Sequence, residues 1–243
     1  MQHESAADGV VDVALVGVDE MVGAYCRRDE PLDGDFTRGE IRGGLALTEP
    51  NCGTDLQAIR TTAVRKGGDY VINGTKTFIS NGQNCGLVIV VAKTAPDASP
   101  PHKGVSLILV EGDAPGFERG RNLSKLGLKG QDTSELFFND CRVPAENLLG
   151  QEGQGFKMLM EKLQQERLCI GVGSMASCRR SLDDTLDYVK ERTAFGKPIG
   201  QFQNTQFKLA ELASQVEIGQ AFVDKLLVAH VRGEEIVSEV SMA

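Results

Sequence analysis

The segment Leu45-Ala46-Leu47-Thr48-Glu49-Pro50-Asn51-Cys52-Gly53-Thr54-Asp55 is where an apolar run ends abruptly in a polar loop. Pro50 fixes its own φ and biases the residue before it toward extended backbone, so the preceding strand must stop there. Gly53 has no Cβ, which lets the backbone approach a ligand closely. The backbone N–H groups of such a turn, with the Thr48 and Thr54 hydroxyls, suit a phosphate or another polar cofactor edge. From residue types alone, a polar turn that closes a strand is the favoured interpretation.

Short runs rich in Val, Ile, Leu and Phe continue around this loop as far as residue 144, separated by Gly, Asp and Asn. They predict strands at Leu45–Leu47, Ile59–Val64, Tyr70–Ile72, Lys76–Ile79, Leu87–Ala92, Val105–Val110 and Leu136–Phe138. The dipeptide Asn73-Gly74 predicts a hairpin turn, because both residues tolerate a positive φ. Since no helices intervene, the pattern favours a β-barrel or sandwich over a doubly wound sheet.

Beyond residue 144 the apolar period becomes helical. One stretch carries Phe156, Leu159, Leu163, Ile170 and Gly173, a second carries Leu182, Leu186 and Val189, and a third runs from about Asn204 to Arg232 with Gly233 as C-cap. These stretches predict long antiparallel helices of a bundle. The expected fold is therefore α+β and multidomain: a divergent or disordered segment 1–35, a middle β-barrel or sandwich domain at 36–148, and part of an antiparallel α-helical bundle at 149–243.

Composition narrows the possible partners and compartment. A net charge of −8 and a pI near 5.0 disfavour nucleic acid and anionic membranes as partners. No apolar run approaches the ~20 residues of a membrane span, and the start lacks a signal segment. The six cysteines form no C-x-x-C pair, and the three histidines are scattered, so no metal site is expected. The cysteines indicate a reducing environment and a cytoplasmic location.

The motif Thr48-Glu49-Pro50-x-x-Gly53-Thr54-Asp55 resembles a signature of the acyl-CoA dehydrogenase family of FAD-dependent flavoproteins, and further matches follow from about Phe36 onward. The resemblance implies oxidation of an acyl-CoA thioester to the trans-2-enoyl-CoA, as in fatty acid β-oxidation. It also implies an electron-transferring flavoprotein as acceptor and a homo-oligomer of two or four chains. Members of the family carry a helical domain before this motif and further bundle helices after the matched segments. The chain is therefore expected to be truncated at both ends, with a divergent start as the alternative for its first residues.

Phe78-Ile79-Ser80 on its own indicates a strand end with a core aromatic residue. The resemblance implies that the Phe78 ring lies against the flavin and that the Ser80 hydroxyl hydrogen-bonds near the reactive flavin nitrogen, where the family more often has Trp and Thr. It also implies cofactor contacts from Leu45, Leu47, Thr48, Gly53, Thr54 and Ile79. Thr54 is further expected at the CoA end of the substrate. Thr94 loosely matches a position that touches CoA, with a plain loop residue as the alternative.

Glu166 is the candidate general base. Seven positions along a helix return to within ~20° of the same direction, so Glu166 is expected in line with Leu159 and Gly173 inside the apolar stripe. Burial raises the pKa of a carboxyl group, as a general base requires. Periodicity alone leaves this interpretation level with a structural ion pair, for example with Arg167. The resemblance favours the base: in the isovaleryl-CoA and long-chain branches a Glu immediately before an Arg removes the proton, and Arg167 would help position the CoA end.

The run Gly171-Val172-Gly173-Ser174-Met175-Ala176 also satisfies G-x-G-x-x-A, and Glu191 follows about 20 residues later. A dinucleotide fingerprint requires a preceding strand, whereas here a helical stripe continues through the motif. Small residues at Gly171, Gly173, Ser174, Ala176 and Ser177 instead indicate close helix packing. The Rossmann interpretation is therefore rejected.

The segment from Arg192 to Gln203 indicates by itself a helix end, a loop and a new helix. Its pattern Arg-x-x-Phe-Gly-x-Pro-Ile-x-x-Phe-Gln resembles the family's segment that reaches the FAD of a neighbouring subunit. The resemblance implies that Arg192 contacts the pyrophosphate and that Phe195 and Gln203 contact the adenosine portion. A planar guanidinium suits a diphosphate. Two alternatives stay open: an oxidase-like flavoenzyme that passes electrons to oxygen, and a non-catalytic fragment or partner subunit.

Overall fold

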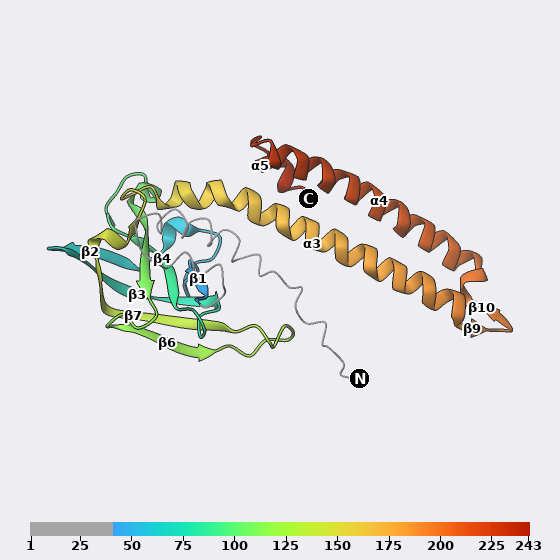
Figure 1. The fold of residues 1–243 in the computed structure, drawn as a ribbon, viewed down its shortest axis with the longest axis horizontal. Coiled ribbons are helices and arrows are strands. Elements are labelled where there is room, and N and C mark those ends of the chain that lie inside the picture. The colour runs from blue at the N-terminus through green and yellow to red at the C-terminus, as the bar shows by residue number, and fades with distance from the viewer. Residues whose placement is uncertain (1–40) are drawn as a thin grey trace. The chain divides into compact units, whose positions relative to one another are not determined.

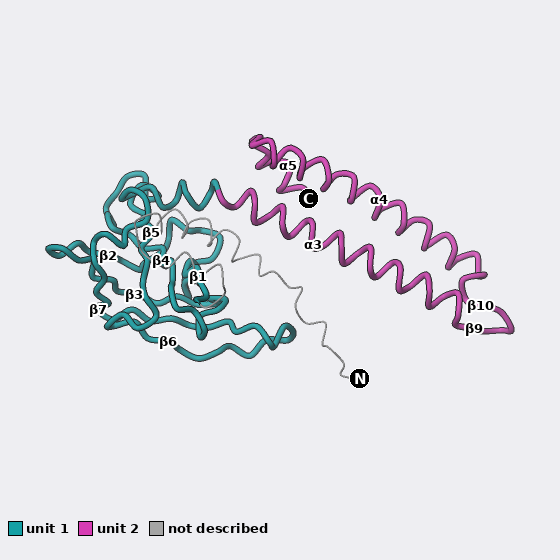
Figure 2. The backbone as a smooth tube through the Cα atoms, in the orientation of Figure 1, with its two compact units in different colours: residues 1–161 teal, residues 162–243 magenta. Residues whose placement is uncertain are grey.

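A computed structural model describes residues 41–243, which form two compact units: one ends at Glu161 and the other is Lys162–Ala243 (Figure 2). The first unit is built from β-strands and the second from helices (Figure 1). This confirms the α+β class, with a β-domain followed by antiparallel helices. The segment 1–35 predicted to be divergent or disordered lies outside the described residues. No helix between residues 41 and 243 is both long and apolar enough to cross a membrane.

The first unit holds an eight-stranded mixed sheet. Its strands are β1 (Gly43–Ala46), β2 (Thr62–Lys66), β3 (Asp69–Ser80), β4 (Leu87–Lys93), β5 (Val105–Glu111), β6 (Phe117–Asn122), β7 (Thr133–Pro144) and β8 (Leu148–Leu149). Their order is β6-β7-β3-β2-β4-β5-β8, and β1 pairs in parallel with β4. Three short 3₁₀ turns lie between strands, namely η1 (Leu56–Ala58), η2 (Pro101–Gly104) and η3 (Ala145–Asn147).

Strand β4 is buried on both faces, which explains its unbroken apolar sequence. Val88 and Val90 belong to a core cluster shared with β3 and β7, where Phe138 lies fully buried. The alternate residues of β4, such as Ile89, belong to a second cluster that includes Leu159 at the start of helix α3 (Gly155–Glu191). The sheet therefore encloses one core and is covered on its other face, as the predicted sandwich or barrel requires.

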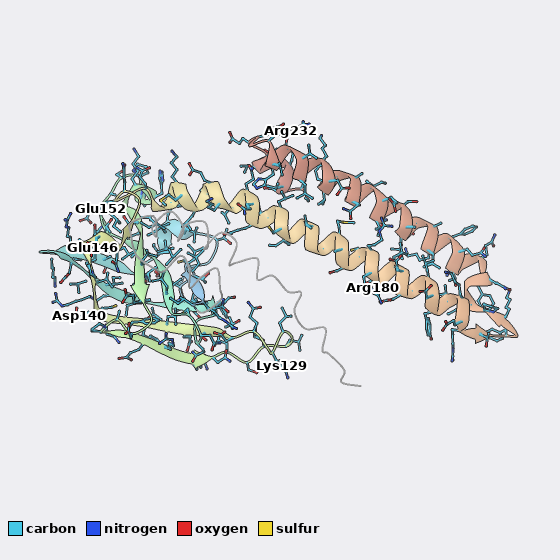
Figure 3. All side chains as sticks on the ribbon, viewed as in Figure 1. Lys129, Asp140, Glu146, Glu152, Arg180 and Arg232 are labelled. Carbon is cyan, nitrogen blue, oxygen red and sulfur yellow. The ribbon has the colours of Figure 1, made fainter. Side chains whose placement is uncertain are left out.

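The predicted hairpin at Asn73-Gly74 is wrong, because β3 runs without a break through both residues. The turn lies instead at Gly67-Gly68, where Lys66 pairs with Asp69. Asn73 exchanges two hydrogen bonds with Asp140 of β7, one from its Nδ2 to Oδ1 (3.1 Å) and one from the Asp140 N–H to its Oδ1 (2.9 Å); Figure 3 labels Asp140. The pairing of β3 with β7 thus outweighs the local turn preference, and a register shift at Gly74 accommodates it.

The second unit consists mainly of two long antiparallel helices. Helix α3 spans 37 residues, so the first two predicted helical stretches are one continuous helix. The hairpin β9 (Thr193–Ala194) and β10 (Lys197–Pro198), the turn η4 (Ile199–Gln201), α4 (Gln203–Val231) and α5 (Val237–Val240) follow. An ion pair joins α3 to α4, from Arg179 Nη1 to Glu217 Oε1 at 2.6 Å.

The residue pattern of these helices is partly as predicted. Gly233 follows α4 with a φ of 75° and donates its N–H to the His230 carbonyl at 2.9 Å, which confirms the C-cap. Helix α3 contains the whole G-x-G-x-x-A run, so no strand precedes it and the rejection of the Rossmann interpretation is confirmed. Gly171 packs near Val223 and Ala243, but Gly173 is exposed with no atom near its missing Cβ. The placement of Gly173, and of the 60% exposed Ile170, on the apolar face was therefore wrong.

Candidate flavin and substrate site

Two chain segments that are distant in sequence meet at the end of β1. The Thr77 N–H donates to the Thr48 carbonyl at 2.9 Å, and Asn81 Nδ2 donates to the Gly43 carbonyl at 3.3 Å. The residues from Gly43 to Thr48 therefore run beside the end of β3. This contact brings together the two groups of predicted cofactor residues, those of the first polar loop and those near Ser80.

The end of β3 is shaped by a bulge. The pairing of β3 with β7 shifts register between Lys76 and Ile79, and Phe78 within the bulge has a φ of 59°. A positive φ in a bulky residue is uncommon and strained. Bulges re-aim side chains, and here the Phe78 ring is 67% exposed while Ile79 is buried. The predicted core aromatic is thus on the surface, where its ring face is free for a planar ligand.

Two hydroxyl groups lie on these adjoining segments. Thr48 and Ser80 are both half-buried, and within residues 41–243 neither side-chain hydroxyl makes a hydrogen bond to the protein. Leu45 and Leu47 are also half-buried and pack against the second core cluster. Unused hydroxyls at neighbouring strand ends suit the polar edge of a cofactor.

The loop after Thr48 turns tightly. Glu49 and Cys52 exchange backbone hydrogen bonds of 3.0 and 3.1 Å across the intervening Pro50 and Asn51. Gly53 and Thr54 are exposed, and no protein atom lies within 4 Å of a Cβ built on Gly53. The loop backbone at these two residues is open to a ligand.

Thr94 is half-buried and hydrogen-bonded to the protein. Its hydroxyl lies 2.7 Å from the Ser106 hydroxyl, and its N–H donates to the Gly104 carbonyl at 2.9 Å. The Ser106 hydroxyl also accepts the Gly153 N–H at 2.9 Å. These contacts favour the structural alternative for Thr94 over a role in CoA binding.

Sequence reasoning missed a buried ion pair at this site. Lys76 Nζ lies 2.9 Å from Glu49 Oε1, and both side chains are almost fully buried. Burial opposes the charge of Glu49, but Lys76 and the N–H groups of Arg60 and Thr61 outweigh it and lower the pKa of this carboxyl. A lysine in an apolar strand was the available signal, but its partner lies 27 residues away and no local pattern identifies it.

Glu166 and Arg167 lie on α3 in the second unit. Glu166 is half-buried, and among the described residues its carboxylate makes neither a hydrogen bond nor an ion pair within 4 Å. Burial raises the pKa of Glu166 above its ordinary value, and the positive charge of Arg167 opposes this rise. Arg167 itself donates from Nη1 to the Ser241 hydroxyl at 3.2 Å. Within residues 41–243, no structural ion pair accounts for Glu166.

The segment from Arg192 to Gln203 forms an exposed hairpin between α3 and α4 (Figure 1). Phe195 and Gly196 at its tip have φ values of 53° and 77°, the pattern of a type I′ turn. The Phe195 ring is 96% exposed, an unusual state for an aromatic residue at a strained position. Arg192 and Gln203 are exposed as well. This hairpin offers an aromatic ring, a guanidinium and an amide to a partner molecule.

Comparison with known proteins relates the chain to one enzyme family. Residues 44–141 match the middle domain of acyl-CoA dehydrogenases, and residues 153–243 match their C-terminal domain. The long-chain specific acyl-CoA dehydrogenase of mouse mitochondria is 49% identical over 195 residues, which are 80% of this chain and 45% of that protein. The acryloyl-CoA reductase (NADH) of Anaerotignum propionicum is 41% identical over 209 residues, 85% of this chain and 52% of that protein.

A solved structure agrees. The acyl-CoA dehydrogenase of Geobacillus kaustophilus has a TM-score of 0.87 and 48% identity, covering 94% of this chain and 63% of that chain. The chain thus spans about half the length of the curated relatives it matches. Both matched domains, in the same order as the two units, give one conclusion: this chain belongs to the acyl-CoA dehydrogenase family.

Proposed function

We propose that the protein catalyses the FAD-dependent α,β-dehydrogenation of an acyl-CoA thioester to the trans-2-enoyl-CoA, as in fatty acid β-oxidation. One observation carries the proposal beyond family membership. Two adjoining segments joined by the Thr77–Thr48 hydrogen bond carry an exposed aromatic ring and two hydroxyls that make no hydrogen bond within residues 41–243. This combination suits a flat, polar-edged ring system such as a flavin.

The residues present fit FAD. The Phe78 ring would lie against the isoalloxazine, and the Thr48 and Ser80 hydroxyls would hydrogen-bond its polar edge, with Leu45, Leu47 and Ile79 lining the site. The open loop at Gly53 and Thr54 would admit the cofactor to the backbone. When bound, FAD supplies the acceptor for the hydride that leaves the β-carbon of the substrate.

Glu166 is the proposed catalytic base. Its half-buried carboxylate, which lacks an ion-pair partner among residues 41–243, would take the proton from the α-carbon of the thioester. Partial desolvation strengthens a carboxylate as a base, since it destabilises the charged form that must accept the proton. Removal of this proton and loss of the β-hydride together leave the α,β double bond.

Arg167 and Thr54 would bind the CoA end of the substrate. Thr94 is a weaker candidate for CoA binding, because its hydroxyl is already hydrogen-bonded to Ser106. The position of Glu166 directly before Arg167 favours long or branched acyl chains, as in the long-chain and isovaleryl-CoA branches. The similarity to the mouse long-chain enzyme supports the same substrate class.

A second copy of the chain would complete the FAD site. The exposed Arg192 would reach the pyrophosphate of FAD bound to a neighbouring subunit, and Phe195 and Gln203 would reach its adenosine portion. A dimer or tetramer follows from this arrangement. An electron-transferring flavoprotein is the proposed acceptor by family analogy. The cytoplasmic location expected from the sequence also stays a proposal, because the mouse relative is mitochondrial.

An anaerobic titration tests the function. The purified protein should be yellow, and its visible flavin absorbance should bleach on addition of acyl-CoA, faster with long or branched chains than with short straight ones. Slow reoxidation in air supports the dehydrogenase, whereas rapid reoxidation with peroxide formation identifies the oxidase-like alternative. A protein that binds no FAD at any concentration would contradict the proposal and favour a non-catalytic partner subunit.

A further inference from the structure

The buried ion pair between Lys76 and Glu49 uses most of its hydrogen-bonding capacity. Lys76 Nζ donates to Glu49 Oε1 at 2.9 Å and to the Leu47 carbonyl at 3.0 Å. The Glu49 carboxylate also accepts the Arg60 N–H at 2.7 Å and the Thr61 N–H at 3.0 Å. Lys76 is fully buried in strand β3, and the Glu49 side chain is only 2% exposed.

Stability alone does not explain such a pair. Removing two charges from water is costly, and a well-packed apolar pair of similar volume is often at least as stable. Breaking one partner of a buried pair is far more harmful than replacing both. What a buried, hydrogen-bonded pair supplies is a fixed geometry between the segments that carry it.

The pair joins the two segments that present the flavin-facing groups. Glu49 follows Thr48 directly, and Lys76 precedes the bulge that turns Phe78 outward. The contact from Lys76 Nζ to the Leu47 carbonyl adds a second link, and the Thr77–Thr48 hydrogen bond adds a third. All three links therefore join residues 47–49 of the loop to residues 76–77 of the strand.

We propose that Glu49 and Lys76 are positioning residues of the flavin site. On the basis of the proposed function, the pair fixes the Thr48 hydroxyl relative to the Phe78 ring and the Ser80 hydroxyl, so that all three meet the isoalloxazine together. Neither residue contacts the reacting atoms. Without the pair, the loop and the strand end would each keep their backbone conformation, but they would no longer be held in a fixed position relative to each other.

A double-variant cycle separates positioning from stability. Lys76→Met and Glu49→Gln each leave one buried charge unpaired, so each should lower the urea unfolding midpoint. The double variant removes both charges, and the introduced amide keeps an acceptor oxygen for only one of the Arg60 and Thr61 N–H groups, so its midpoint should rise above that of either single variant without reaching that of the parent. Its FAD dissociation constant should nevertheless stay at least about tenfold weaker, as when supporting groups stop holding ligand-binding groups in place.

Spectroscopy provides the second readout. The visible circular dichroism of bound flavin should change in the double variant, because the ring sits differently between Thr48 and Phe78. The matched control is Arg121→Met with Glu135→Gln, which removes an exposed ion pair of the same sheet and should change neither quantity. A double variant that is more stable than either single variant and keeps parental FAD affinity and a parental spectrum would show that the pair is merely structural.

A milder variant covers the case in which the double variant does not fold. Glu49→Asp keeps the charge but withdraws the carboxylate by one methylene, so FAD binding should weaken and the flavin spectrum should shift in a folded protein. Parental FAD affinity in this variant would overturn the proposal. Failure of the parent itself to bind FAD would instead overturn the proposed function, so the two results are distinguishable.

Discussion

At the scale of the residue, Glu166 is a half-buried carboxylate that the described structure leaves unpaired. Unpaired and partly desolvated charges are destabilising, and they concentrate at functional sites because catalysis uses the raised basicity. Arg167 beside it donates a hydrogen bond to the Ser241 hydroxyl. The two neighbours thus differ: Arg167 is anchored by a hydrogen bond, and Glu166 has no such partner within residues 41–243.

We predict that Glu166→Gln slows flavin reduction by acyl-CoA by about 10²- to 10⁴-fold, since the general base is lost while shape and FAD binding persist. Anaerobic stopped-flow absorbance measures the rate. Glu161→Gln is the matched control, because Glu161 lies on the same helix with an exposed side chain paired to Lys157. Equal rates for parent and Glu166→Gln would refute the assignment of the base.

The raised pKa of Glu166 predicts a pH dependence. Only the carboxylate accepts a proton, so the rate of flavin reduction should rise with pH and reach half of its maximum above 4.5, the ordinary value of the group. The free energy of unfolding depends on pH in the opposite direction to the rate. Because the raised pKa marks a penalty on the charged form, the stabilisation from neutral Glu166 is complete below 4.5 and is lost as pH rises through the raised value. Glu166→Gln should remove both dependences, which rate–pH and urea–pH profiles would record.

The cysteines should differ sharply in reactivity. Burial raises the pKa of the Cys141 thiol to about 11, whereas Cys178 is exposed on α3. The thiolate is the reactive form, so iodoacetamide at mildly alkaline pH should modify Cys178 well before Cys141. Peptide mass spectrometry after timed quenching measures the two rates. Modification of Cys141 as early as Cys178 in folded protein would contradict its burial.

At the scale of the element, β3 shows how strand pairing overrides a turn signal. The close approach of Gly74 to Thr61 explains why glycine is needed there: a Cβ on Gly74 would lie 2.7 Å from the Thr61 Cα. The glycine that suggested a turn is therefore a packing requirement inside a strand.

We predict that Gly74→Ala lowers the free energy of unfolding by about 1–3 kcal/mol, because the methyl group collides with backbone that cannot move freely. Gly68→Ala is the control, since no atom lies within 4 Å of its added Cβ, and it should change stability by no more than about 0.5 kcal/mol. Urea titration of both variants measures the difference. Equal stabilities would show that Thr61 shifts at little cost.

At the scale of the whole molecule, Thr48, Phe78 and Ser80 lie in one unit, and the hairpin between Arg192 and Gln203 lies in the other. The proposed assembly divides each FAD site between two copies of the chain. In such an assembly, each copy contributes its strand ends to one FAD site and its hairpin to another. Variants in these two parts should therefore complement each other, which a site within one chain would not allow.

Two inactive variants should therefore restore FAD binding when combined. Arg192→Met removes the hairpin cation, and Thr48→Ala with Ser80→Ala removes both hydroxyls, so each variant alone should bind FAD weakly. Co-expressed and purified as a mixed oligomer, they should recover part of the parental flavin content, since one site per mixed pair is intact. Flavin absorbance per chain measures recovery. A mixed oligomer with no recovery would place the whole site within one copy.

The sequence alone predicted the strand-rich middle segment, the long helices and their C-cap, because hydrophobic period and capping chemistry are local properties. It also singled out Glu166 and the motif residues as candidates, since these lie in contiguous patterns, and their roles stay predictions. The residue pattern around Phe78 indicated a core position and not an outward turn, because a bulge arises from the register of β3 against β7, which is a relation between distant strands.

Only the tertiary structure decided which distant groups meet. Lys76 and Glu49 are 27 residues apart, and the sequence near either residue does not identify the other as its partner. The Asn73-Gly74 pair favours a turn in isolation, but hydrogen bonds to Asp140 keep it within a strand. In both cases the deciding free energy comes from burial and pairing between segments that become neighbours only after the sheet has formed, and no local pattern contains that information.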